Sequence, residues 1–242
     1  MRIHLERLGS GRKLLFVHGA GGSSASWYFQ RALAEVCEVI VLDLPGHGSS
    51  APEGLRTIDG YVKAVRAAII ENGLEGCSVA GHSMGGAIAL CLALSSPEIV
   101  AGLALVATGA RLRVLPEILE GLLKDKEATV RTIVGLAFSE GAPRPLVEAG
   151  FAEMMKAGKE VIHGDFSACD EVDLMGRLTH ISLPTLVICG ADDRLTPPRY
   201  SEYLAREITG ADLMVIPSAG HMVMLEKPEE TNRALSRFLS RI

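Results

Sequence analysis

The chain has 242 residues, of which 48% are hydrophobic, and its formal net charge at pH 7 is −5. This length is sufficient for one large α/β domain with a substantial core, or for two small domains. Neither positive nor negative residues form a long run, which argues against a nucleic-acid partner. No apolar run reaches the ~18–20 residues of a membrane span, and the first residues do not resemble a signal peptide, which argues against a membrane partner.

Strand and helix patterns alternate over the first 110 residues. Residues 2–7 alternate between apolar and polar side chains, which is typical of a half-buried strand. Continuous apolar runs, typical of strands covered on both faces, follow at 13–17, 38–42, 77–80 and 100–106. Helical patterns lie between them at 26–35, 58–71 and 86–94. This alternation predicts a mostly parallel sheet with helices on both faces.

The pattern changes at residue 111. Apolar side chains from Leu115 to Phe138 recur at helical spacing, and further helical patterns lie at 146–157 and 161–169. The α/β pattern then returns with strands at 184–189 and 212–216 and helices at 198–207 and 228–241. We therefore expect an α/β core formed by residues 1–110 and 182–242, and an all-helical insertion, residues 111–181, that forms a cap.

A G-x-S-x-G sequence stands at the end of the fourth predicted strand. The apolar run leads directly into Gly81-His82-Ser83-Met84-Gly85, and a helical pattern of small apolar residues follows. A sharp turn there would hold Ser83 in a strained conformation and leave no room for side chains two residues away, which explains the glycines. The N-terminus of the next helix favours developing negative charge. The pentapeptide alone is a weak signal, because a glycine-rich turn that contains a serine with no catalytic role can have the same sequence pattern.

Three more distinctive loops follow predicted strands. His18-Gly19-Ala20-Gly21-Gly22 follows the second strand, Asp192-Asp193 the sixth, and His221 the seventh. The carboxyl ends of parallel strands meet at the sheet edge where ligands bind. With these loops, and with the chain order Ser83…Asp193…His221, the sequence resembles the α/β-hydrolase superfamily over nearly its whole length, the cap excepted.

The resemblance implies an α/β-hydrolase fold. The family core has eight strands, and this chain begins too late for the usual first one. We therefore expect a seven-stranded sheet in which only the first strand is antiparallel, with the cap inserted after the sixth of the family's eight strands.

Acyl-transfer chemistry gives the three side chains distinct roles. A serine hydroxyl needs a base, so Ser83 is the expected nucleophile and His221 the base that later returns the proton to the leaving alcohol. Asp193 would fix the imidazole tautomer. The family places its acid three residues after the strand-ending glycine, here Gly190, which favours Asp193; Asp192 is then a turn former.

An oxyanion hole needs two backbone donors. The residue after the nucleophile, Met84, supplies one, and the resemblance places the other at Ala20, with Gly21 as the alternative. Candidate pocket residues are Trp27, Met154 and Met155. For each of the three, packing in the core or within the cap is the competing interpretation.

Together these residues predict a serine hydrolase that cleaves carboxylic esters of small to medium apolar acyl compounds through an acyl-enzyme. Dehalogenases and epoxide hydrolases of this fold carry aspartate in place of Ser83. Thioesterase, lactonase, acyltransferase and cofactor-free perhydrolase or haloperoxidase chemistry stay open. Carbon–carbon hydrolysis is disfavoured because Gly21-Gly22-Ser23 departs from the His-Gly-x-Gly-Pro-Gly loop of those enzymes. A non-catalytic ligand-binding receptor is the alternative from another class.

The expected partner is a small-molecule ester or related acyl substrate, and nothing in the sequence specifies an oligomeric state. No cofactor or metal is expected, because the triad needs none and His18 and His82 lack partners at ligand spacing. The five cysteines, at positions 37, 77, 91, 169 and 189, are odd in number and lie mostly in apolar segments. They indicate reduced, buried thiols and a cytoplasmic protein.

Overall fold

In the computed structural model, residues 2–242 are described, and within them seven strands form one sheet in the order β1-β3-β2-β4-β5-β6-β7. The strands are His4–Leu8 (β1), Lys13–Val17 (β2), Glu38–Asp43 (β3), Cys77–His82 (β4), Val100–Val106 (β5), Thr185–Gly190 (β6) and Asp212–Ile216 (β7). β1 is antiparallel to β3, and every other neighbouring pair is parallel. The predicted seven-stranded, mostly parallel sheet is confirmed.

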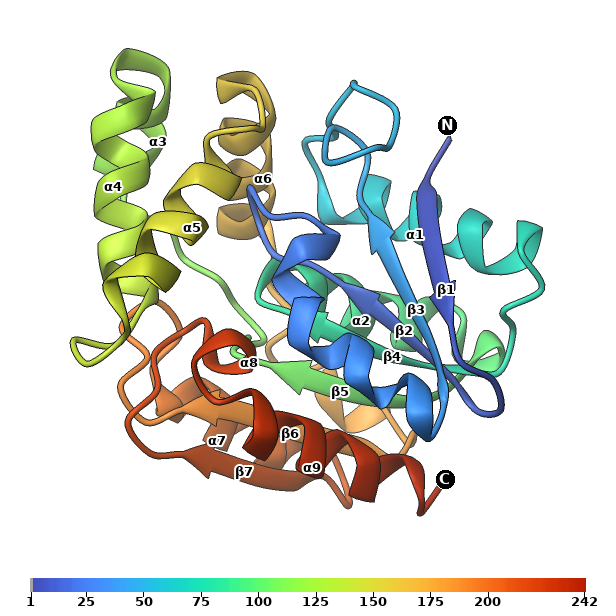
Figure 1. Ribbon diagram of the computed structural model, residues 1–242. Helices are drawn as coiled ribbons and strands as arrows, with labels where there is room; N and C mark the ends of the chain where they lie inside the picture. The colour runs from blue at the N-terminus through green and yellow to red at the C-terminus, as the bar shows by residue number, and fades with distance from the viewer. Residues whose placement is uncertain (1) are drawn as a thin grey trace.

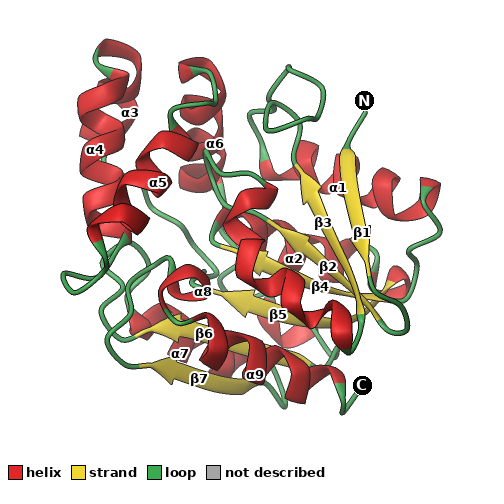
Figure 2. Ribbon diagram, in the orientation of Figure 1, coloured by secondary structure: helices red, strands yellow, loops and turns green. Residues whose placement is uncertain are grey.

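Helices cover both faces of this sheet (Figure 2). They are Ser24–Glu35 (η1), Ile58–Glu71 (α1), Met84–Ser95 (α2), Pro97–Ile99 (η2), Leu178–His180 (η3), Pro198–Glu207 (α7), Val223–Glu226 (α8) and Pro228–Leu239 (α9). Helices α1, α2 and α7 pack on one face, while η1, α8 and α9 pack on the other. Alternate residues of each buried strand pack against the two helical layers. Leu15 packs on the side of α1, α2 and α7, and Phe16 packs on the side of η1, α8 and α9.

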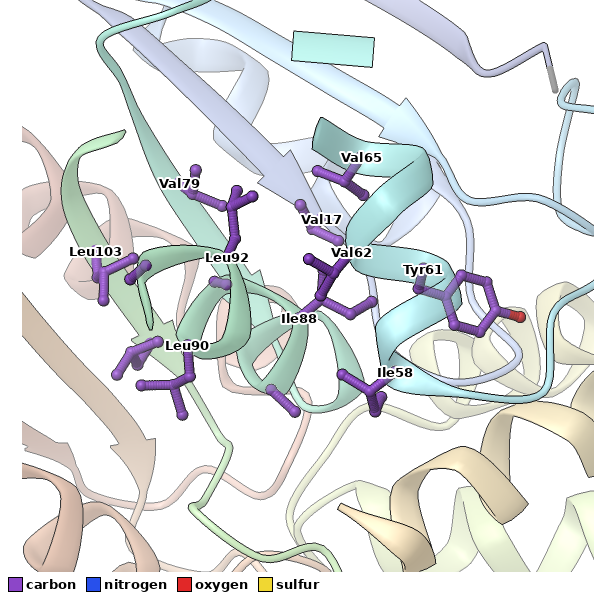
Figure 3. Packing of buried hydrophobic residues seen from close by; sticks show 14 of the residues in the cluster. Val17, Ile58, Tyr61, Val62, Val65, Val79, Ile88, Leu90, Leu92 and Leu103 are labelled. Atoms are coloured by element: carbon purple, nitrogen blue, oxygen red, sulfur yellow. The ribbon is translucent and has the colours of Figure 1, made fainter. Parts of the chain in front are cut away.

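Helix α2, which begins directly after Ser83, is enclosed by the core. Its sequence is apolar all round, as expected of a helix with no solvent face. Figure 3 shows Ile88 of α2 near Val62 of α1 and Leu92 near Val79 of β4, while Leu90 points to the side of α2 away from α1. This packing fixes the helix whose N-terminus supports the candidate site.

Most predicted helices agree with the structure; the differences are the form of η1 and the short helices η2, η3 and α8, which were not predicted. The segment predicted as an ordinary helix at 26–35 is a 3-10 helix, η1, interrupted at Trp27, where φ is −108° and ψ is 23°. Ser23 caps it by accepting from the backbone N–H of Ala25 at 3.1 Å. Helix α8 was not predicted, because a four-residue helix is too short to show a periodic pattern.

Four helices occupy the chain between β5 and η3. They are Pro116–Lys124 (α3), Lys126–Ala137 (α4), Arg144–Met154 (α5) and Lys159–Glu171 (α6). Figure 1 shows them together on the side of the molecule toward which the arrowheads of β2 and β5 point. They share a hydrophobic cluster of their own that includes Leu122, Val134 and Ile162. That residues 111–181 are a distinct cap domain stays a prediction.

Among the helices formed by residues 2–242, none has the length and apolar character needed to cross a membrane.

Candidate active site

Ser83 stands at the junction of β4 and α2 in a backbone conformation that non-glycine residues rarely adopt, with φ 52° and ψ −116°. Its N–H donates to the carbonyl oxygen of Val106 at 3.0 Å. A Cβ at Gly81 would lie 2.2 Å from the carbonyl oxygen of Gly85, and a Cβ at Gly85 would lie 2.3 Å from that of Val17. The two glycines are therefore required by the close approach of backbone to this turn.

His221, which follows β7, faces Asp193, which follows β6. His221 Nδ1 lies 2.9 Å from Asp193 Oδ2. The other oxygen, Oδ1, accepts from the backbone N–H groups of Leu195 at 2.9 Å and Thr196 at 2.8 Å. The Thr196 hydroxyl donates to Oδ2 at 2.8 Å. The structure thus brings Asp193 to the imidazole, whereas the Asp192 side chain is exposed.

Asp193 is held as a carboxylate. Its burial alone raises its pKa, but the neighbouring His221 and the hydrogen bonds from His221 and Thr196 outweigh burial, so the pKa lies below the ordinary value of an aspartate. A charged acceptor opposite Nδ1 keeps the proton on that nitrogen and leaves Nε2 free to act as a base.

Ser83 and His221 line the same cavity of about 210 Å³. Within residues 2–242, no hydrogen bond joins Ser83 Oγ to His221 Nε2. Such contacts are often long in an enzyme without substrate and shorten in the complex.

The backbone N–H groups of the two expected oxyanion donors make no hydrogen bond within residues 2–242. One belongs to Met84, the first residue of α2, where no helical partner exists. The other belongs to Ala20, in the loop after β2. The N–H of Gly21, the alternative considered from the sequence, donates to Asp165 Oδ2 at 2.9 Å and is therefore occupied.

A second cavity, of about 310 Å³, lies beside the first. Met154, one of the candidate pocket residues, lines both cavities. The other two candidate pocket residues line neither cavity. Trp27 is completely buried and packs on Phe16 with ring centroids 4.7 Å apart, so it is a core residue. Met155 belongs to the hydrophobic cluster of α3–α6.

A sequence profile described as "Alpha/beta hydrolase family" matches residues 14–234. The chain belongs to the alpha/beta hydrolase family. A Pseudomonas putida protein named dihydrolipoyllysine-residue acetyltransferase component of acetoin cleaving system is 33% identical; the match covers 95% of this chain and 64% of the relative. This hydrolase thus spans less than two thirds of that relative's length.

Other relatives of this alpha/beta hydrolase are matched over almost their whole length. A pimeloyl-[acyl-carrier protein] methyl ester esterase from Nitrosomonas europaea is 28% identical, with 94% of this chain and 96% of the relative covered. A solved structure described as a thermophilic esterase is 37% identical, covers 98% of each chain and superposes with a TM-score of 0.87. These relatives support a hydrolase, with esterases among the proteins that it resembles in sequence and architecture.

Some residues around the hydrolase's candidate site were missed from the sequence. Tyr28 and Phe29, rather than their neighbour Trp27, line the larger cavity. Phe138 and Met222 also line it, from segments far apart in the chain, and no local pattern marks them. Thr196 could have been found, because a threonine three residues after an aspartate commonly bonds its side chain within a turn.

Proposed function

We propose that this alpha/beta hydrolase is a serine esterase that cleaves carboxylic esters of small to medium apolar acyl compounds. The observation that carries the proposal is the strained Ser83 in a cavity that it shares with His221, whose Nδ1 is hydrogen-bonded to Asp193. The N–H groups of Ala20 and Met84, which make no hydrogen bond within residues 2–242, support the proposal because they can donate to the oxyanion.

The proposed reaction has two halves. His221 Nε2 accepts the proton of Ser83 as Oγ attacks the ester carbonyl, and the N–H groups of Ala20 and Met84 stabilise the oxyanion. As the intermediate collapses, the imidazolium gives its proton to the leaving alcohol, and an acyl-enzyme remains. His221 then takes a proton from water as the water attacks the acyl group, the bond to Oγ breaks, the carboxylic acid leaves and His221 returns the proton to Ser83.

Helices α3–α6, which we take as the cap, supply much of the cavity lining, and this lining favours uncharged acyl groups. Two arginines border the smaller cavity, and both donate hydrogen bonds to backbone carbonyl oxygens. Arg194 donates to the carbonyl oxygens of Gly135 and Phe138. Arg113 donates to the carbonyl oxygen of Asp170 at 2.8 Å and lies 3.8 Å from its carboxylate. Each guanidinium is thus tied through one nitrogen to carbonyl oxygens of the protein itself, and most of the remaining lining of this cavity is apolar.

A matched pair of esters tests this substrate class. We expect kcat/KM for p-nitrophenyl hexanoate to exceed that for mono-p-nitrophenyl adipate, of the same chain length, by ~100-fold or more, because an unpaired carboxylate in an apolar site costs several kcal/mol. Steady-state rates at neutral pH give the ratio. Similar values would refute the apolar class, and a thioester or lactone preferred over both esters would refute the esterase assignment.

The pH dependence of the reaction should show one acid limb. Protonated His221 cannot accept the Ser83 proton, so kcat/KM should fall as the pH is lowered. Because the pKa of Asp193 is below its ordinary value, its carboxylate stays charged over the acid limb, and only one group governs the fall. The logarithm of kcat/KM should therefore approach a slope of one against pH. A slope of two, or a flat profile down to about pH 4, would contradict the assignment.

We place the reaction in the cytoplasm, because the five cysteines are unpaired thiols and four of them are buried.

A further inference from the structure

Asp165, on helix α6, is a completely buried carboxylate that the proposed reaction does not use. A buried carboxylate is costly unless it is paired and hydrogen-bonded, so its contacts show what it holds in place. Oδ2 accepts from the backbone N–H of Gly21 at 2.9 Å and contacts His47 Nε2 at 2.9 Å. Oδ1 accepts from the hydroxyl of Tyr61.

Both ring nitrogens of the partner His47 face oxygen atoms. Its Nδ1 lies 3.0 Å from the carbonyl oxygen of Pro45, and its Nε2 faces Asp165, so both ring nitrogens must donate. Burial lowers the pKa of His47, but the hydrogen bond and charge of Asp165 outweigh burial and hold the pKa above its ordinary value. Oδ2 of Asp165 thus serves two groups, the imidazole of His47 and the N–H of Gly21.

The contact with Gly21 fixes the loop that carries the proposed oxyanion donor. Gly21 has φ +64°, which makes it the corner of a tight turn from Gly19 to Gly22. Within the turn, the carbonyl oxygen of Gly19 accepts from the N–H of Gly22 at 3.1 Å and contacts His18 Nδ1 at 2.8 Å. Because a trans peptide directs its N–H opposite its carbonyl, these bonds orient the N–H of Ala20.

A second bond from the same group of helices supports the loop. The hydroxyl of Ser23 donates to the carboxylate of Glu153, on α5, at 2.6 Å. The loop is thus stabilised by the hydrogen bond between Gly19 and Gly22 within the turn, and by hydrogen bonds to side chains of α5 and α6. Of the two hydrogen bonds to side chains, only that of Asp165 reaches a backbone N–H of the turn and is buried.

We propose that Asp165 is a positioning residue for the oxyanion hole: by holding the N–H of Gly21, it keeps the N–H of Ala20 directed at the reacting carbonyl, so that docking of α6 completes the site. This inference rests on the proposed serine-esterase function.

The test compares three variants in p-nitrophenyl hexanoate hydrolysis. Asp165→Leu leaves the N–H of Gly21 without an acceptor, and kcat should fall ~10–100-fold, part of the ~10²–10³ that loss of one oxyanion donor costs. KM should change less than about two-fold, because the ground-state carbonyl depends little on the oxyanion hole. Binding of a trifluoromethyl ketone, which forms an oxyanion on Ser83, should weaken ~10-fold or more.

Two matched variants separate positioning from stability. In Asp165→Asn the amide oxygen can still accept from Gly21, so kcat should recover to within about three-fold of wild type. Tyr61→Phe removes the bond to Oδ1 but leaves Gly21 untouched; it should lower Tm with kcat nearly unchanged. Should Asp165→Leu not fold, Asp165→Ala, which adds no apolar bulk, replaces it.

Wild-type kcat in the Leu or Ala variant would overturn the inference, as would an equal loss of kcat in Tyr61→Phe. Ser83→Ala shows whether the underlying function holds: if it retains activity, the proposed esterase mechanism fails, whereas an inactive Ser83→Ala beside a fully active Asp165→Leu refutes only the role of Asp165.

Discussion

Replacing Ser83 with alanine should lower kcat for p-nitrophenyl hexanoate by a factor of ~10⁵–10⁶, the scale on which loss of a serine nucleophile acts. The N–H groups of Ala20 and Met84 and the cavity would remain, so binding of the ester should change little. The residual rate would come from the remaining donors and from binding alone.

The fold should survive this substitution. Alanine meets the same φ of 52° that serine already tolerates, and the backbone bond from residue 83 to Val106 does not involve the side chain. Tm should therefore stay within a few degrees of wild type. Ser49→Ala, at an exposed position outside both cavities, is the matched control and should keep full activity.

A fluorophosphonate probe gives an independent measurement. It should label wild type and Ser49→Ala at Ser83, and it should not label Ser83→Ala. Turnover by Ser83→Ala above a tenth of the wild-type rate would refute the nucleophile assignment. Folded wild type that neither reacts with the probe nor turns over any ester would instead support a ligand-binding protein.

The sheet and the turn at Ser83 were predictable because their causes are local. A strand covered on both faces must be a short apolar run, and β2, β4 and β5 are visible for that reason. The glycines at 81 and 85 are visible because no side chain fits there. The order of loops then follows from the topology, since parallel strands deliver their carboxyl ends to one edge.

The cavity lining was less predictable, because it depends on how distant segments pack. Trp27 is buried in the core, whereas its neighbours Tyr28 and Phe29 line the larger of the two cavities, and apolar composition alone does not distinguish the three. Of two adjacent methionines, only Met154 lines the cavities. Asp165 carried no signal at all, since an aspartate on an amphipathic helix ordinarily faces solvent.

Asp193→Asn should lower kcat by ~10⁴ while the fold is retained, the magnitude that this substitution has in a serine protease. The backbone N–H groups of Leu195 and Thr196 both donate to Oδ1, so the amide oxygen of asparagine must occupy that position. Its NH₂ group then stands at the place of Oδ2, opposite His221 Nδ1. That nitrogen must accept, the ring proton moves to Nε2, and His221 can no longer take the proton of Ser83.

Asp192→Asn is the matched control, because it makes the same chemical change one residue away on an exposed side chain. Its kcat should stay within about two-fold of wild type, and a large loss there would refute the assignment of Asp193 as the acid. Stability separates a tautomer effect from unfolding. The Thr196 hydroxyl, which donates to Oδ2 in wild type, can rotate and accept from the asparagine NH₂ group, so no buried polar group need lose its partner. A large loss of kcat with a nearly unchanged Tm is therefore the result that identifies Asp193 as the group that orients the catalytic base.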